Sequence, residues 1–415
     1  MVKTKYLGTK FAFIILVTVV GSRLWSFHGI PERGFDVLEF LIALSLILVV
    51  IFGLHNIEGN ASKFRINVWL FIIIPLIGAV SASIYHDQSI VYGLAVLRTN
   101  FIWLLYFVLH IFNIPRKYVI AWMTVAGIVW ASLTILQQFT YPVYFFYTRN
   151  EEIGSEFIRA GMYRFMIEPH QFGLFLVVYY YCRFLLKLEA KALFLVLIGL
   201  AGFYCFSTRQ FAVAALACML IATAMTPGLA KVYVIGIVSV IIGILALANI
   251  DAILGTYVDM TYEQLRSSQE DIRMYSAKYW LFDYWPHWIT MLVGNGLEHM
   301  NTKYGAEIFY LNDALNFYRS DVGIIGAFNV FGIFYALNII WLNVKGILGK
   351  FYTEKTKYLK LFFVNALLLV ILSEQYSNGA AIPFFCFVLY LVDKSSEKKS
   401  RIEESSKHLQ AETSA

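Results

Sequence analysis

The chain has little charge for its size. Only 14% of its 415 residues are Asp, Glu, Lys or Arg, whereas 59% are hydrophobic and the mean hydropathy is +0.66. Soluble domains carry about 25% charged and about 45–50% apolar residues. The shortage of charge excludes an ordinary soluble enzyme, a disordered chain and a nucleic-acid-binding domain. It predicts an all-α polytopic membrane protein.

Signatures of metal, nucleotide and disulfide chemistry are also missing. The chain has no P-loop, no dinucleotide fingerprint and no paired-Asp metal motif, and its eight histidines show no HxxxH or HExxH spacing. Glu168 and His170 stand two residues apart, which alone does not make a metal site. All four cysteines lie within apolar runs, so no disulfide is expected. We therefore predict neither a metal site nor a cofactor.

Long apolar windows supply the transmembrane prediction. A helix needs about 20 apolar residues to cross a bilayer, and these runs are too continuous for barrel strands. About twelve spans are predicted, at 9–27, 35–54, 67–85, 90–112, 117–138, 170–187, 191–206, 210–226, 231–249, 322–343, 358–375 and 378–393.

Basic residues predict the orientation of these spans. With the N-terminus in the cytoplasm, about 21 of the 33 Lys and Arg residues fall in inner segments. We therefore expect both termini to lie in the cytoplasm. The expected parts are spans over 1–249, a large outer loop over 250–321, spans over 322–393, and a charged cytoplasmic tail over 394–415, which is expected to be disordered.

Two predicted outer loops are unusually long, and such loops are often functional. The first covers about 139–169 and the second is the 250–321 loop. Residues 262–292 of the second are rich in aromatic side chains and predict helices that lie along the membrane surface. Further aromatic residues of this loop could stack on a ligand or pack against these helices, namely Tyr304, Tyr310, Phe317 and Tyr318.

Charged residues within or beside the spans gather toward the predicted outer face. Arg98 lies in the outer half of its span, and Asp321 lies where the large loop re-enters the membrane. The outer arginines are Arg159, Arg164, Arg209, Arg266, Arg273 and Arg319. Arginine binds phosphate oxygens through forked, charge-assisted hydrogen bonds. A lipid-linked diphosphate is therefore the expected ligand, although single arginines also extend from buried stems to the interface or pair with carboxylates.

Three motifs carry a family resemblance. The first runs from Arg159 through Arg164 to Glu168-Pro169, the second is Ser207-Thr208-Arg209, and the third runs over 271–332. The third contains Arg273, the turn Gly294-Asn295-Gly296 and the segment Asp321-Val-Gly323-Ile-Ile-Gly326. In their order and topology they resemble bacterial O-antigen and exopolysaccharide repeat-unit polymerases of the Wzy type.

The resemblance implies an activity and partners. It implies a glycosyltransferase C-like fold that joins undecaprenyl-diphosphate-linked repeat units at the periplasmic face of the bacterial inner membrane, and it implies a chain-length regulator protein as a partner. Ligases of the same superfamily carry a His-Asn pair near the end of the large loop. Here Asp321 occupies that place and His299 is the closest histidine in the loop, which favours a polymerase.

Residue roles follow from the chemistry of glycosyl transfer. Arg209 and Arg273 would bind the diphosphate, with Arg159 or Arg164 in support and with Arg98 and His299 as further binding candidates. A carboxylate would serve as base, with Asp321 ahead of Glu168. The alternatives are that Asp321 caps span ten and that Glu168 pairs with Arg164. Because arginines can replace a metal, metal-independent activity is expected.

Two other functions stay open on the sequence. An O-antigen ligase would use the same fold and donor with a different acceptor. A lipid-linked oligosaccharide flippase or transporter fits the chain length. However, transporters of two symmetric halves more often hold polar groups at mid-depth, whereas the charged residues here gather at one face.

Overall fold

The computed structural model describes residues 6–23, 32–53, 55, 62–141, 143, 158–159, 162–163, 167–206, 208–226 and 272–413. These residues are helical, apart from loops and one antiparallel pair of two-residue strands, β1 (Ile158–Arg159) and β2 (Met162–Tyr163). The predicted helical class is confirmed.

The first half of the chain supplies most of the long helices. They are α1 (Leu7–Gly21), α2 (Glu32–Gly53), α3 (Arg65–Tyr85), α4 (Ile90–Val96), the 3-10 helix η3 (Leu97–Leu104), α5 (Leu105–Phe112), α6 (Arg116–Thr140), α7 (Gln171–Lys187), α8 (Ala190–Phe206) and α9 (Arg209–Met225).

The second half alternates short and long elements. They are α12 (Ile272–Lys278), the π-helix η6 (Tyr279–Asp283), α13 (Trp288–Val293), α14 (Lys303–Leu315), the 3-10 helix η7 (Arg319–Val322), α15 (Ile324–Phe331), α16 (Ile333–Leu348), the 3-10 helix η8 (Glu354–Thr356), α17 (Leu359–Leu369) and α18 (Ile382–Thr413).

Four helical segments among the described residues are long and apolar enough to cross a membrane. They are Gly34–Gly53, Arg65–Tyr85, Ile90–Phe112 and Arg116–Thr140. Five further apolar helices have 10–17 residues and coincide with other predicted spans. The structure thus supports a membrane protein with four candidate spans, rather than the full predicted set. The predicted span 231–249 lies outside the described residues.

The helices depart from the predictions at a glycine within one predicted span and in the C-terminal tail. The predicted span 322–343 is broken at Gly332, which has a φ of +82° and separates α15 from α16. The tail was predicted to be disordered, and this was wrong, because α18 continues to Thr413. The tail contains four Glu and four Lys residues, which favour helix, and it extends a helix that is already nucleated.

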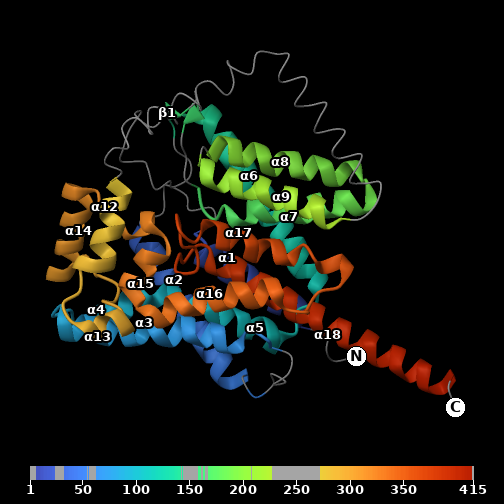
Figure 1. The fold of residues 1–415 in the computed structure, drawn as a ribbon, viewed down its shortest axis with the longest axis horizontal. Coiled ribbons are helices and arrows are strands. Elements are labelled where there is room, and N and C mark those ends of the chain that lie inside the picture. Colours follow the sequence, from blue (N-terminus) through green and yellow to red (C-terminus); the bar gives the residue numbers. More distant parts are fainter. Residues whose placement is uncertain are drawn as a thin grey trace.

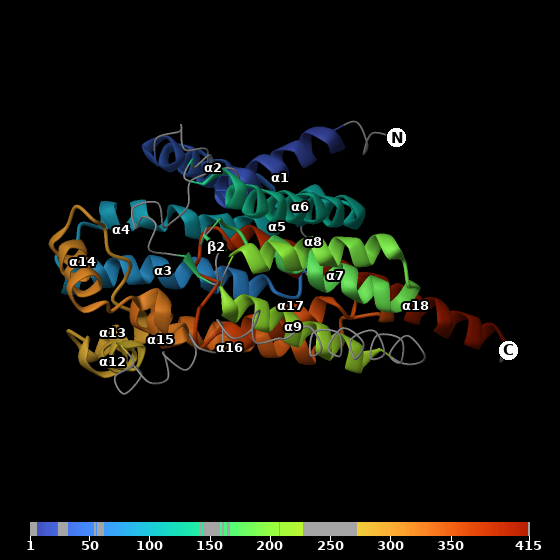
Figure 2. The same ribbon diagram turned by 90° about the horizontal axis from the view of Figure 1, so that it is seen from above.

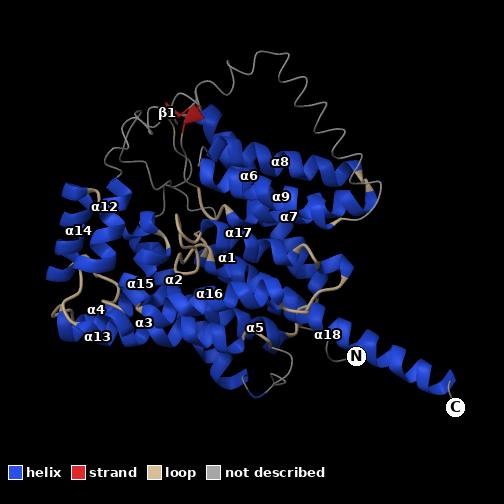
Figure 3. Ribbon diagram, viewed as in Figure 1, coloured by secondary structure: helices blue, strands red, loops and turns tan. Residues whose placement is uncertain are grey.

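The helices form an elongated bundle with distinct ends. Helices α12, α13 and α14 lie at the left end in both Figure 1 and Figure 2, whereas the start of α1 and the end of α18 lie toward the right. Helices α6, α7 and α8 pack against one another on one side. Loops gather in the middle of Figure 3, between α15 and α17, and these loops position the site described below.

The cap at the left end consists of the described loop residues 272–321. Surface helices were predicted within 262–292, and the described part of that range contains α12, η6 and α13. The further cap helix α14 was not predicted. Trp280 was expected at the membrane interface but is fully buried, because the π-helix η6 turns it inward against Arg319.

Two glycines of the predicted Gly294-Asn295-Gly296 turn join the cap to the bundle. Their φ angles are +85° and +78°. A Cβ on Gly294 would lie 2.2 Å from the Val330 carbonyl oxygen, and one on Gly296 would lie 2.4 Å from the Gly78 carbonyl oxygen. The backbone N–H of Gly296 donates to Val330 O at 2.8 Å. This turn is therefore needed for close packing.

We expect Gly296→Ala to destabilise the folded protein by about 1–3 kcal/mol, because it forces both a left-handed φ and a clash with backbone. The free energy of unfolding can be measured by denaturation of the purified protein in detergent. Gly8→Ala in α1 is the matched control, since no atom lies within 4 Å of the added Cβ. Equal stability of the two variants would contradict this account.

Candidate functional site

A cavity of about 860 Å³ lies where the cap meets the ends of several helices. Its walls come from segments that are far apart in the sequence. The lining residues come from the end of α1 and from α2 (Gly21, Arg23, Glu39), from η3 (Thr99), from the segment before α7 (Ile167, Glu168, His170), from the end of α8 to the start of α9 (Phe206, Thr208, Gln210, Phe211), from the cap (Arg273, Leu297, Glu298, Arg319, Ser320, Asp321), from α15 and the residue before it, and from the loop between α17 and α18. The described parts of all three motif regions contribute to this one cavity.

The cavity brings together three of the predicted site residues. Glu168 precedes α7, Arg273 lies in α12, and Asp321 lies in η7, and all three line the cavity. Asp321 does not cap the following helix, because Gly323 occupies the N-cap position of α15 and no side chain caps it. The capping alternative for Asp321 was therefore wrong, and its exposed carboxylate faces the cavity.

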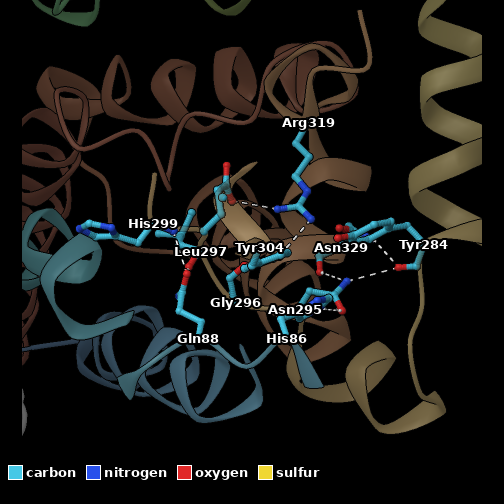
Figure 4. A network of polar contacts seen from close by, with 12 residues as sticks. His86, Gln88, Tyr284, Asn295, Gly296, Leu297, His299, Tyr304, Arg319 and Asn329 are labelled. Atoms are coloured by element: carbon cyan, nitrogen blue, oxygen red, sulfur yellow. Dashed lines mark hydrogen bonds and ion pairs between the residues drawn. The ribbon is translucent and has the colours of Figure 1, made fainter. Parts of the chain in front are cut away.

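Two predicted binding residues lie away from the cavity walls. Arg98 donates through Nε to Glu39 Oε2 at 2.9 Å and also pairs with Asp36. Glu39 is 1% exposed and also accepts from Arg23 Nε at 2.7 Å, so Arg98 is held in a cluster that joins α1, α2 and η3. His299 accepts a hydrogen bond from the Asn301 N–H at 3.1 Å, and its ring points away from Arg319 in Figure 4.

The remaining predicted arginines are described only in part. Arg159 belongs to strand β1, and Arg209 is the first residue of α9. The neighbours of Arg209, Thr208 and Gln210, both line the cavity. Arg164 lies outside the described residues, and so does its suggested ion pair with Glu168.

Sequence reasoning did not select the loop between α17 and α18 as part of the site. Within it, Glu374 lines the cavity and accepts hydrogen bonds from the backbone N–H groups of Tyr376 and Ser377, the latter at 3.0 Å. The only sign of Glu374 in the sequence was a single carboxylate at the end of the apolar run of the predicted span 358–375. The loop geometry that places it in the same cavity wall as Glu168 could not be deduced from the sequence.

The same loop also positions Glu168. Asn378 Nδ2 donates to both carboxylate oxygens of Glu168, at 3.3 Å and 3.1 Å. Asn378 is itself held, since its Oδ1 accepts from the Ala380 N–H at 3.1 Å. On the other side, Trp130 Nε1 donates to the Ile167 carbonyl at 2.8 Å. A half-buried carboxylate with fixed orientation therefore faces the cavity.

Arg319 links separate segments of the cap at the cavity wall. Its Nη1 donates to Glu298 Oε2 at 2.9 Å and its Nη2 to Tyr304 Oη at 3.1 Å (Figure 4). Its guanidinium carbon lies 4.5 Å from the centre of the Trp280 ring. Hydrogen bonds and cation–π contact thus come from three cap segments.

The surroundings of the Arg319 guanidinium keep it charged. Burial alone would lower the pKa of Arg319, but Tyr304 and Glu298 outweigh burial, and the pKa is raised. Burial raises the pKa of Tyr304 to about 12, so its phenol stays neutral at physiological pH. Arg319 is therefore a permanent cation in the cavity wall.

An ordered set of asparagines supports the cap below Arg319. Asn295 N–H donates to the Asn329 carbonyl at 3.0 Å, and Asn329 Nδ2 donates to the Trp280 carbonyl at 2.9 Å. His86 Nε2 lies 3.2 Å from Asn295 Oδ1, and its ring stacks 4.0 Å from that of Tyr304 (Figure 4). These contacts fix the cap relative to α3 and α15.

The cavity walls carry charges of both signs. The cap carries the cations Arg273 and Arg319 together with Glu298 and Asp321, the loops at the helix ends carry Glu168 and Glu374, and the segments at α1 and α2 carry Arg23 and Glu39. Such an arrangement can hold an anionic group at a cation and accept a proton at a carboxylate. Among the described residues, no group of three or more His, Cys, Asp or Glu side chains is arranged to hold a metal ion.

Neither the family models of known proteins nor the curated proteins give a match to this chain.

We expect Arg319→Leu to reduce the free energy of unfolding by about 3 kcal/mol, because it leaves Glu298 partly buried without its partner. The matched control is Arg183→Leu, which removes the more exposed ion pair with Glu189 at 2.8 Å and should cost about 0–1 kcal/mol. Denaturation in detergent compares the two variants. Similar losses of unfolding free energy in the two variants would show that the ion pair of Arg319 contributes no more than an exposed pair does.

Proposed function

We propose that the protein polymerises undecaprenyl-diphosphate-linked oligosaccharide repeat units at the periplasmic face of the bacterial inner membrane. The observation that carries the proposal is the cavity that gathers Arg273, Glu168 and Asp321 from separate parts of the chain. Chemistry at an outer face has no ATP and needs a preactivated donor, which a glycosyl diphosphate lipid provides. The proposal includes the full set of about twelve spans and cytoplasmic termini.

The proposed reaction needs a proton acceptor and a cation. The acceptor sugar hydroxyl attacks the anomeric carbon of the donor glycan, and the new C–O bond forms as the bond to the diphosphate oxygen breaks. The hydroxyl proton passes to a carboxylate, and undecaprenyl diphosphate leaves as the anion. Arg273 and Arg209, supported by the positive field of Arg319, would stabilise the charge on the leaving diphosphate.

Glu168 is our choice for the base, ahead of Asp321. Asn378 holds both oxygens of Glu168, and the residue is half-buried. Asp321 is exposed, and within the part of the chain that the structure describes its carboxylate accepts a hydrogen bond only from the neighbouring Ser320 hydroxyl, at 3.3 Å. A fixed, partly desolvated carboxylate meets the geometric need of general-base catalysis better than an exposed one.

The experiment that tests the function is deletion of the gene in the native host. Extraction and sizing of lipid-linked and surface glycans by gel and mass spectrometry should show single repeat units at the surface and no longer chains. Full-length polymer left on undecaprenyl diphosphate would indicate a ligase instead. Repeat units trapped at the cytoplasmic side would indicate a flippase.

Complementation of the deletion strain with variant genes tests the proposed role of Arg273. Arg273→Ala should fail to restore long chains at unchanged protein level. Lys278→Ala should restore them, because Lys278 is an exposed cation of the same helix, α12, and is not part of the cavity wall. Normal chain length with Arg273→Ala would contradict its proposed role.

A second prediction separates the two carboxylates. We expect Glu168→Gln to slow elongation by purified protein about 100-fold or more, because it removes the proton acceptor while keeping the shape of the side chain. Asp321→Asn should cause a smaller loss. Asp313→Asn, on the exposed face of α14, is the control. A larger loss with Asp321→Asn than with Glu168→Gln would assign the base to Asp321.

A further inference from the structure

One wall of the cavity carries buried polar side chains with unused hydrogen-bonding capacity. His170 is 6% exposed, and within the described chain neither of its ring nitrogens has a hydrogen-bond partner. Gln375 is 5% exposed, and its Nε2 is likewise unpartnered there. Both residues line the cavity. Buried polar groups are nearly always paired, so these atoms are suited to bind something that enters the cavity.

Neighbouring contacts hold both side chains in place. Gln375 Oε1 accepts a hydrogen bond from Gln171 Nε2 at 3.5 Å, which leaves the Nε2 group of Gln375 as the available donor. The His170 ring packs 3.9 Å from the Phe211 ring and 5.4 Å from the Phe206 ring, measured between centroids. The donors and acceptors are therefore preorganised, which lowers the entropic cost of binding.

Two aromatic rings border these polar atoms. Phe206 and Phe211 line the cavity beside His170, at the end of α8 and near the start of α9, and are 1% and 6% exposed. A pyranose ring has an apolar face of C–H groups and a rim of hydroxyls that each donate and accept. An imidazole offers one donor and one acceptor, and a primary amide donates, so the wall matches both parts of such a ring.

We propose that His170, Gln375, Phe206 and Phe211 form a subsite for an uncharged sugar ring, the one that supplies the attacking hydroxyl. The inference rests on the proposed polymerase function and adds the acceptor position to it. Glu168 stands two residues before His170, and Asn378, which holds Glu168, stands three residues after Gln375. A sugar on this wall therefore lies beside the proposed base.

Charge argues against a diphosphate at the same place. The carboxylates of Glu168 and Glu374 flank this wall, whereas the cations Arg273 and Arg319 belong to the cap. An anion beside two carboxylates would be repelled, while sugar hydroxyls can donate hydrogen bonds to them. The acceptor sugar thus lies next to the two carboxylates, and the diphosphate of the donor lies toward Arg273 of the cap and Arg209 at the start of α9.

The test measures sugar binding without the reaction. The probe is the free repeat-unit oligosaccharide, released by mild acid from the lipid-linked glycans of the deletion strain. The full-length protein is reconstituted in nanodiscs, because glycoside detergents would themselves supply sugars. We expect His170→Phe, which keeps the aromatic stacking, to weaken binding about tenfold or more by calorimetry, and Gln375→Leu to weaken it several-fold.

A matched control and a second variant keep the test decisive. His287→Phe removes an exposed imidazole of the cap outside the cavity and should bind as the wild type does. Thermal unfolding verifies that each variant is folded, and Gln375→Leu tests the subsite if His170→Phe does not fold. No binding by the wild type, or binding by both cavity variants within about twofold of it, would overturn the proposal.

The outcomes also distinguish this inference from the proposed function. Loss of oligosaccharide binding in the variants, together with long chains in the deletion strain, would support the sugar subsite and refute the polymerase. Unchanged binding in both variants, together with loss of elongation on deletion, would refute the subsite and leave the polymerase supported.

Discussion

The cap depends on one buried cation. Arg319 contacts Trp280, Glu298 and Tyr304, which belong to three segments that share no secondary structure. A guanidinium removed from water must recover its lost hydration through such contacts, so its charge selects one arrangement of the three segments. Because Arg319 is the first residue of η7, the same arrangement fixes where the chain re-enters the bundle and where Asp321 faces the cavity.

The opposite wall is organised by a short loop rather than by a helix. The segment between α17 and α18 carries Glu374 and Gln375, and its Asn378 holds Glu168. Irregular backbone within a membrane protein is tolerated where it lines a polar cavity, since its N–H and C=O groups then find partners. Here the carboxylate of Glu374 supplies such a partner to Tyr376 and Ser377. The same loop thus forms a wall of the cavity and supplies partners for its own backbone N–H groups.

Sequence reasoning reached the helical class, most helix positions and three of the cavity residues. Hydropathy places helices well because it reports local composition, and the motif order indicated that Glu168, Arg273 and Asp321 could meet. It failed for Arg98 and His299, whose neighbours are set by packing between distant segments. It also missed His170 and Gln375 as site residues. Whether a buried polar atom lacks a hydrogen-bond partner depends on its neighbours in the folded structure, which the sequence does not give.

The 3-10 helix η3 changes the length of the segment from Ile90 to Phe112. A 3-10 helix rises about 2.0 Å per residue and an α-helix about 1.5 Å, so its eight residues add about 4 Å to the segment. At about 38 Å it exceeds a hydrocarbon core of about 30 Å. This hydrophobic mismatch requires the helix to tilt or the bilayer to thicken around it. The thickness of the surrounding membrane would then act on Thr99, which sits in η3 and lines the cavity.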